Sequence, residues 1–311
     1  MKKISVLLAC QNEEHLVGLS IVSFLRFADE IIVVENGSID RSAEICDELA
    51  SVFPNVVKFI SAPDVVHLYE NRQIALREST GSWIVRADAD YVCYSDGKFD
   101  SLSARQYLLH SHPVLSLPRF RVPHASLFFD FFHTVKEDRP WGYGNIISRG
   151  DERIYHRFSG MRFERKGRWE GLSSGGPRQM FRQFPSPIWM HCDIKSPLNM
   201  FYRRYRTDWR ENGDFLSFPT LDSYILARLG LESVESFSEV ANAYVFSDVV
   251  PYMRKYEEEV NWPVPKLVCL ARERGYGYVY DPSVPGCRRY SGPPPIQFLK
   301  EVGRSLLFSR E

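Results

Sequence analysis

Two aspartates one residue apart form the first pattern in the sequence that suggests chemistry. Asp88 and Asp90 stand at the end of the short apolar run from Trp83 to Ala87, which is typical of a buried strand. In an extended or turning segment, side chains at positions i and i+2 project to roughly the same side, so both carboxylates can face one divalent ion, a ribose or a diphosphate. An isolated Asp-x-Asp is more often an exposed turn, so the surrounding sequence must decide between the two interpretations.

Three other polar clusters also follow short apolar runs. The runs are Ile4–Ala9, Glu30–Val34 and Val56–Ile60, and the polar clusters after them are Gln11-Asn12-Glu13, Glu35-Asn36-Gly37-Ser38 and the surroundings of Asp64. Helical patterns separate the runs, at residues 12–27, with Asn12 as the expected N-cap, and at 40–52 and 70–78. This alternation predicts right-handed crossovers and a mostly parallel sheet covered by helices on both faces. Ligands bind beyond the carboxyl ends of the strands in such a sheet, so we expect the polar clusters to share one edge.

The composition predicts an ordinary globular protein and argues against nucleic acid as a partner. Hydrophobic residues make up 44% of the 311 residues and aromatic residues 14%, which excludes wholesale disorder. Lysine plus arginine and aspartate plus glutamate both number 39, so no global charge attracts a polyanion. A predicted helix at 199–209 is rich in arginine, including Arg203, Arg204 and Arg206, but no nucleic-acid-reading motif accompanies it. Any recognition of an anion is therefore expected to be local.

The cysteines and the apolar segments predict a cytoplasmic location. The six cysteines are scattered without a Cys-x-x-Cys pair, which favours a reducing compartment. The apolar segment at the start of the chain is too short, and too soon followed by charged residues, for a signal peptide. No run of about 18 apolar residues occurs, so no membrane span is predicted.

The order of the polar clusters resembles the nucleotide-sugar-binding half of family 2 glycosyltransferases with the GT-A fold. The shared features are a strand followed by Asn12-Glu13-Glu14, a strand that ends at an acid before Asn36-Gly37-Ser38-Ile39-Asp40, and Asp88-Ala89-Asp90. The resemblance covers residues 4–95, and within the family it is closest to the bacterial branch that extends lipopolysaccharide cores and capsules. It implies a GT-A type, Rossmann-like α/β fold with a nucleotide-sugar-binding half at 1–112, an acceptor-binding half at 113–218 and a helical C-terminal appendage at 219–311.

The resemblance also implies a donor site at the carboxyl edge of the sheet. The residues assigned to this site are Gln11, Asn12, Glu13, Glu35, Arg72, Asp88, Asp90 and Lys195. Glu35 would accept a hydrogen bond from the base or ribose, and Asp88 would face the ribose or a metal. Asp90 would coordinate the Mg²⁺ or Mn²⁺ that bridges the donor diphosphate. Arg72 would contact a phosphate, unless it belongs to a solvated face of its helix.

A histidine later in the chain is a candidate for a further metal ligand. The apolar run Ile188–Met190 ends at His191, where the family has a histidine that can be the third ligand. An imidazole suits Mn²⁺ better than a purely oxygen site would, although a lone histidine is usually structural, so both interpretations stay open. Lys195 follows in the next loop and would then touch the diphosphate.

One glutamate resembles the family's catalytic base. The segment Gly167-Arg168-Trp169-Glu170-Gly171-Leu172 is similar to the branch's Gly-x-Val-His-Glu-x-Leu, with Trp169 in place of His. An inverting transfer needs a carboxylate to take the proton of the acceptor hydroxyl, and Glu170 is the candidate. Alternatively, Glu170 forms a surface salt bridge. In that case, the further candidates for the base are Glu137, Asp138 and Glu164.

The last amphipathic segment leaves its partner open. It carries an apolar series beside two basic residues, namely Phe298, Leu299, Val302, Leu306 and Leu307 with Lys300 and Arg304. Such a helix packs on its own domain, packs on a partner subunit, as in a homodimer, or lies on the inner face of a membrane, where lipid-linked acceptors reside.

Together these patterns predict a metal-dependent, inverting glycosyltransferase. Its donor would be a nucleoside diphosphate sugar, with UDP the commonest in the family, and its acceptor a glycan or lipid-linked molecule in cell-surface polysaccharide synthesis. A non-catalytic nucleotide-sugar or glycan-binding protein of the same fold is an alternative. It is considered because Trp169 stands where the family has His, and Gln73 stands where Asn is usual. A sugar nucleotidyltransferase is less favoured, because it would need a Gly-rich, basic loop after the first strand.

Overall fold

A computed structural model describes most of the chain. The described residues are 3–65, 67–97, 100–110, 124–126, 152–166, 169–173, 181–183, 188–192, 197–244, 264–280 and 288–310. Lys195 and the reserve bases Glu137 and Asp138 lie outside these ranges.

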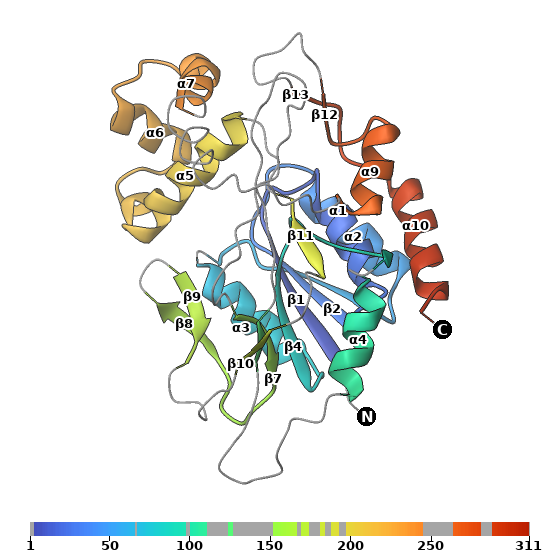
Figure 1. The fold of residues 1–311 in the computed structure, drawn as a ribbon. Helices are drawn as coiled ribbons and strands as arrows, with labels where there is room; N and C mark the ends of the chain where they lie inside the picture. Colours follow the sequence, from blue (N-terminus) through green and yellow to red (C-terminus); the bar gives the residue numbers. More distant parts are fainter. Residues whose placement is uncertain are drawn as a thin grey trace.

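A mostly parallel sheet forms the centre of the fold (Figure 1). Within the described residues it has seven strands in the order β10-β6-β7-β4-β1-β2-β3. Its parallel part consists of β1 (Ile4–Cys10), β2 (Glu30–Glu35), β3 (Val57–Ser61) and β4 (Trp83–Asp88). Beyond β4 lie β7 (Glu152–His156), antiparallel to both β4 and β6 (His124–Ser126), and β10 (Phe181–Gln183), parallel to β6. The predicted fold class is confirmed.

Alternate side chains of the apolar strands enter two cores, one on each face of the sheet. Val6 and Leu8 of β1 belong to one core, whereas Leu7 between them belongs to the other. This period of two is the geometry of a strand, and it explains why the parallel strands are apolar on both faces. The helices that follow the strands are α1 (Val17–Phe24), α2 (Ser42–Val52), α3 (Leu68–Glu78) and α4 (Ser101–His110). The apolar residues of α1 and α2 join the first core, and those of α3 join the second.

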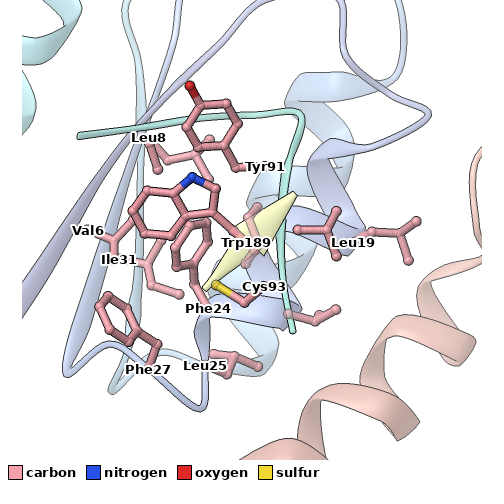
Figure 2. Packing of buried hydrophobic residues seen from close by; sticks show 14 of the residues in the cluster. Val6, Leu8, Leu19, Phe24, Leu25, Phe27, Ile31, Tyr91, Cys93 and Trp189 are labelled. Carbon is pink, nitrogen blue, oxygen red and sulfur yellow. The ribbon is translucent and has the colours of Figure 1, made fainter. Parts of the chain in front are cut away.

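A short antiparallel pair closes the first core near the end of β4. It consists of β5 (Tyr91–Cys93) and β11 (Trp189–His191). Trp189 stacks on Tyr91 at a ring-centroid distance of 5.7 Å and contacts Phe24 of α1 at 5.9 Å (Figure 2). This buried contact fixes the segment around His191 against the segment that follows Asp90.

The predicted N-cap at Asn12 is wrong. Helix α1 begins at Val17, and Asn12 lies in the loop before it with a φ of 53°. Asparagine tolerates this left-handed conformation better than most residues, because its short side chain can bond to nearby backbone. Here its Oδ1 accepts a hydrogen bond from the Ile39 N–H at 2.8 Å. The residue therefore shapes a loop instead of starting a helix.

Three helices gather around a separate apolar core on one side of the molecule (Figure 1). They are α5 (Pro197–Glu211), α6 (Leu221–Leu229) and α7 (Phe237–Tyr244), with the short 3₁₀ turns η2 (Asp214–Leu216) and η3 (Val234–Ser236) between them. Phe201, Tyr224 and Phe237 are among the buried residues of this core. The predicted boundary at residue 218 thus falls between helices that share one core, and the three-part division stays a prediction.

The C-terminal part returns to the first core. It contains α9 (Lys266–Glu273), the hairpin of β12 (Tyr278–Tyr280) and β13 (Arg288–Tyr290), and α10 (Ile296–Phe308). Phe298 and Leu299 of α10 are buried in the first core, and a Cβ added at Gly18 of α1 would lie 2.5 Å from Leu299 Cδ1. The glycine therefore permits the close approach of α1 and α10.

This packing accounts for part of the apolar series of the last amphipathic segment. The chain's own helices cover Phe298 and Leu299, so packing on its own domain is confirmed. The membrane contact and the homodimer stay predictions. Within the described residues, no helix is both long enough and apolar enough to cross a membrane.

Candidate active site

The predicted polar clusters meet at the carboxyl edge of the parallel strands. In the sheet register, Cys10 lies opposite Glu35, and Ala9 lies opposite Asp88. The residues that follow β1, β2 and β4 are therefore neighbours in space. Asp64, which follows β3, is exposed to solvent. The parallel register accounts for this meeting, because every strand of the group ends at the same edge.

The loops after β1 and β2 are tied together by hydrogen bonds. Gln11 Nε2 donates to the Asn36 carbonyl at 2.7 Å, and the Asn12 N–H donates to Ser38 Oγ at 2.8 Å. The Glu13 N–H donates to Ser42 Oγ at 2.7 Å. These three residues of the predicted donor site thus hold the two loops in one shape, and their contacts with a ligand stay a prediction.

Glu35 is buried at the end of β2, with 2% of its surface exposed. Its carboxylate accepts a hydrogen bond from the backbone N–H of Ser38, which closes the turn through Gly37. Gly37 has a φ of 76°, a conformation that favours glycine. The carboxylate therefore stabilises the turn, and its predicted contact with a base or ribose stays a prediction.

Arg72 lies at the centre of a buried charged group, which we call the carboxyl-edge cluster: Arg72, Arg86, Asp88 and Glu170. Its side chain is fully buried, so the interpretation as a solvated helix face is wrong. One guanidinium nitrogen donates to the carbonyls of Leu7, at 2.7 Å, and Ala87, and another donates to Asp88. Nε donates to Glu170 Oε1 at 3.1 Å. Arg72 thus joins β1, β4 and the predicted base in one network.

Glu170 lies on a hairpin that packs against α3. The hairpin consists of β8 (Phe163–Lys166) and β9 (Trp169–Leu172), and Gln73 Oε1 of α3 accepts a hydrogen bond from the Phe163 N–H at 2.8 Å. Gln73, which departs from the family pattern, therefore helps to hold the hairpin in place. The side chain of Glu170 is only 8% exposed, so the alternative of a surface salt bridge does not describe it.

The two oxygens of the Glu170 carboxylate differ in their surroundings. Oε1 faces Arg72 and lies 3.7 Å from Arg86 Nη1. Oε2 is buried and accepts no hydrogen bond from the described part of the chain. A buried carboxylate oxygen usually has a partner, so Oε2 is a candidate to receive a group from a ligand.

Asp90 lies beside the segment of His191. Its side chain is 2% exposed, and its backbone carbonyl accepts a hydrogen bond from the Cys192 N–H at 2.7 Å. His191 is paired with Tyr91 across the β5–β11 ladder. The structure thus brings the backbones of the two predicted metal-binding segments together, and the ligation itself stays a prediction.

The donor atoms of this edge fit a metal that is held jointly with a substrate. Among the described side chains, no group of three or more His, Cys, Asp or Glu residues gathers around a possible metal position. Mg²⁺ commonly binds through one or two carboxylates together with substrate phosphates, so it does not need such a group. Asp90 can supply one carboxylate, whereas the carboxylate of Asp88 faces Arg72.

Helix α5 brings arginines to the same edge. Arg210 Nη1 donates to Gln11 Oε1 at 2.7 Å, and Arg203 Nη1 lies 3.6 Å from Asp90 Oδ2. Burial lowers the pKa of Arg206 below its ordinary value, although the charges of Glu13 and Asp40 oppose this shift. Burial and the nearby charge of Arg206 lower the pKa of Arg210 to about 10.

Sequence reasoning predicted this arginine-rich helix but did not assign it to the site. The spacing of positions 203, 206 and 210 was the available signal, because residues at i, i+3 and i+7 share one face of a helix. That spacing shows a common face but cannot show what the face contacts.

A comparison with protein families matches the first third of the chain. The profile described as Glycosyl transferase family 2 matches residues 5–103. No curated protein matches the chain.

The solved structures that match the chain have low identity to it. TarS from S. aureus is 13% identical with a TM-score of 0.41, over 65% of this chain and 38% of TarS. The mannosyltransferase PcManGT from Pyrobaculum calidifontis, in complex with GDP-Man and Mn²⁺, is 14% identical with a TM-score of 0.42, over 100% of this chain and 86% of that chain. At such identities and TM-scores, these likenesses assign neither a substrate nor a metal.

The family match and the observed sheet describe the same region. Residues 5–103 contain β1 to β4, the carboxyl edge with Glu35, Asp88 and Asp90, and the helices between the strands. This agreement supports a glycosyltransferase as the enzyme class. Residues 5–103 thus match the profile of the family 2 glycosyltransferases, and the matched segment contains the parallel strands β1 to β4.

Proposed function

We propose that the chain is a metal-dependent, inverting glycosyltransferase of cell-surface polysaccharide synthesis. It transfers a sugar from a nucleoside diphosphate sugar, with UDP as the first nucleotide to test, to a glycan or lipid-linked acceptor of the kind that the lipopolysaccharide and capsule branch extends. The observation that carries the proposal is the network through Arg72. This side chain links Asp88, at the donor edge, to Glu170, the candidate base, through direct hydrogen bonds.

The donor lies at the carboxyl edge in this proposal. Glu35 and the loop beside it line the nucleoside end, and Asp88 faces the ribose. Asp90, and His191 from the adjoining strand, would hold Mg²⁺ or Mn²⁺, with Lys195 near the diphosphate. When bound, the cation neutralises charge that develops on the departing diphosphate.

Glu170 is the proposed general base. The acceptor hydroxyl approaches the carboxylate of Glu170, whose side chain is 8% exposed. As the hydroxyl oxygen forms its bond to the anomeric carbon, the bond from that carbon to the diphosphate breaks on the opposite side, and Glu170 takes the proton. Arg72 and Arg86 contact the carboxylate through Oε1, so they fix its orientation.

The first experiment is a thermal-shift screen of the whole chain with UDP, GDP, dTDP and CMP, each with and without Mn²⁺. A ligand that binds the folded state raises the melting temperature, so one nucleotide should stabilise the chain only when the metal is present. Asp90→Ala should lose this metal-dependent shift. Asp47→Ala, an exposed acid on α2, is the matched control and should retain it. Absence of a shift with all four nucleotides would contradict the proposed donor site.

A further inference from the structure

Helix α5 has two opposite faces with different neighbours. Phe201, Tyr205 and Trp209 belong to the apolar core shared with α6 and α7. Positions 203, 206 and 210 lie on the other side of the helix, because each residue advances the helix by about 100°. The apolar side anchors α5, and the arginines therefore project from a fixed support toward the carboxyl edge.

The arginine face spans the edge from the loop after β1 to the end of β4. Arg210 contacts Gln11 at one end, and Arg203 lies near Asp90 at the other. Arg206 stands between them. In the described part of the chain it forms no direct hydrogen bond or ion pair, and Glu13 and Asp40 act on it through space.

Contacts with the described part of the protein compensate the charges of Arg206 and Arg210 incompletely. Gln11 is a neutral amide, so its hydrogen bond leaves the positive charge of Arg210 in place. The lowered pKa values of Arg206 and Arg210 also show that burial disfavours their charged forms. A bound anion would offset this cost.

We propose that the face of α5 that carries Arg203, Arg206 and Arg210 binds the diphosphate of the donor. This inference rests on the proposed function, because the face lies over the edge assigned to the donor. Planar guanidinium groups match phosphate oxygens, and two or three of them can contact a diphosphate at once. The loop after β1 and the end of β4 border the face, so a diphosphate there would lie beside Asp90.

The test compares three probes by isothermal titration calorimetry on the full chain. The probes are inorganic pyrophosphate, the nucleoside diphosphate that stabilises the parent, and the corresponding nucleoside. Arg206→Gln and Arg210→Gln should each weaken binding of both phosphate-containing probes by roughly 10-fold or more, since a hydrogen bond to a charged group is lost. Neither variant should change affinity for the nucleoside.

Arg204→Gln is the matched control. Arg204 is exposed on the same helix, about 100° from Arg203, so its loss should leave all three affinities unchanged. Arg206→Lys tests geometry, because it keeps the charge but removes the planar fork, and we expect an affinity between those of the parent and Arg206→Gln. Arg206→Gln is not used if it melts at a lower temperature than the parent. In that case, the affinities of Arg206→Lys and the parent for the phosphate-containing probes are compared instead.

The outcomes separate this inference from the proposed function. If the parent binds a nucleoside diphosphate and the arginine variants bind it equally well, the role of α5 is wrong and the donor site stands. If the parent binds pyrophosphate through these arginines but binds no nucleotide, the anion surface stands and the proposed donor is wrong. If the parent binds neither, both are wrong.

Discussion

Two arginine–carboxylate clusters lie at opposite edges of the sheet and use the same chemistry differently. The carboxyl-edge cluster centres on Arg72 and joins Asp88 to Glu170. The second, which we call the amino-edge cluster, consists of Asp29, Arg105 and Arg310. Arg105 contacts both oxygens of Asp29, at 2.8 and 3.1 Å, and Arg310 also donates to this carboxylate.

The elements that each cluster joins explain the difference. Asp29 Oδ2 accepts a hydrogen bond from the Ile4 N–H at 2.9 Å, so the amino-edge cluster ties α4 and the end of the chain to the start of β1. These are fixed parts of the scaffold. The carboxyl-edge cluster instead joins the scaffold to a hairpin that carries a carboxylate oxygen with no described partner. The presence of an ion pair alone therefore does not indicate a functional site. What matters is where the pair lies in the fold and whether one of its carboxylate oxygens lacks a partner among the described residues.

The largest effect is expected from Arg72→Met. This change leaves the buried carboxylate of Glu170 and the partly exposed carboxylate of Asp88 without their shared guanidinium, so we expect the free energy of unfolding to fall by about 3–5 kcal/mol. Transfer activity should fall as well, because Glu170 loses its support. Urea denaturation measures the first effect. The control is Arg77→Met, which changes an exposed arginine of the same helix. Equal stability of the two variants would contradict a stabilising role of Arg72 in the carboxyl-edge cluster.

Glu170→Gln should separate catalysis from stability within the carboxyl-edge cluster. The amide keeps the shape of the side chain but is a far weaker base, so transfer should slow by roughly 10²- to 10⁴-fold. Nucleotide binding should be retained, because Glu170 acts on the acceptor. Turnover with a glycan acceptor and titration with the nucleotide measure these two quantities. Glu164→Gln on the neighbouring strand serves as the comparison, and a greater loss there would move the base to Glu164.

Asp29→Asn should reduce stability alone, by about 1–3 kcal/mol, since it weakens charge-assisted hydrogen bonds without touching the site. Burial raises the pKa of Asp29, but the hydrogen bonds from Arg105 and the Ile4 N–H outweigh it and lower the net pKa. A carboxyl group with a lowered folded-state pKa stabilises above its unfolded pKa, and this contribution is lost as the pH falls through the folded value. The difference between parent and variant should therefore shrink below about pH 4 in denaturation curves. A changed nucleotide affinity would contradict a purely structural role.

The sequence predicted the scaffold well because the scaffold depends on local patterns. The alternation of apolar runs and helices predicted β1 to β4 and the edge at which Glu35, Asp88 and Asp90 meet. The prediction failed at Asn12, where a hydrogen bond to the neighbouring loop outweighs the tendency of asparagine to cap a helix. The helix-capping preference of asparagine cannot reveal a hydrogen-bond partner in another loop.

The contacts that shape the site escaped prediction for the same reason. Arg72 stands in a polar stretch that is compatible with an exposed helix face, yet Glu170, 98 positions away in the sequence, helps to bury it. The spacing of the arginines indicated a common face of α5. The position of that face near Gln11 and Asp90, however, depends on how α6 and α7 pack against the helix. Burial of a charged residue is a property of the assembled chain.

The ladder between β5 and β11 has a consequence for the order of folding. It joins the residues that follow Asp90 to a segment that begins at Trp189, so its formation must close a long loop of chain. Closing long loops costs more conformational entropy than forming the short crossovers among β1, β2, β3 and β4. We therefore expect the four parallel strands β1 to β4 to form first and the binding edge to be completed late, so that a refolding chain forms this part of the sheet before it gains affinity for a ligand.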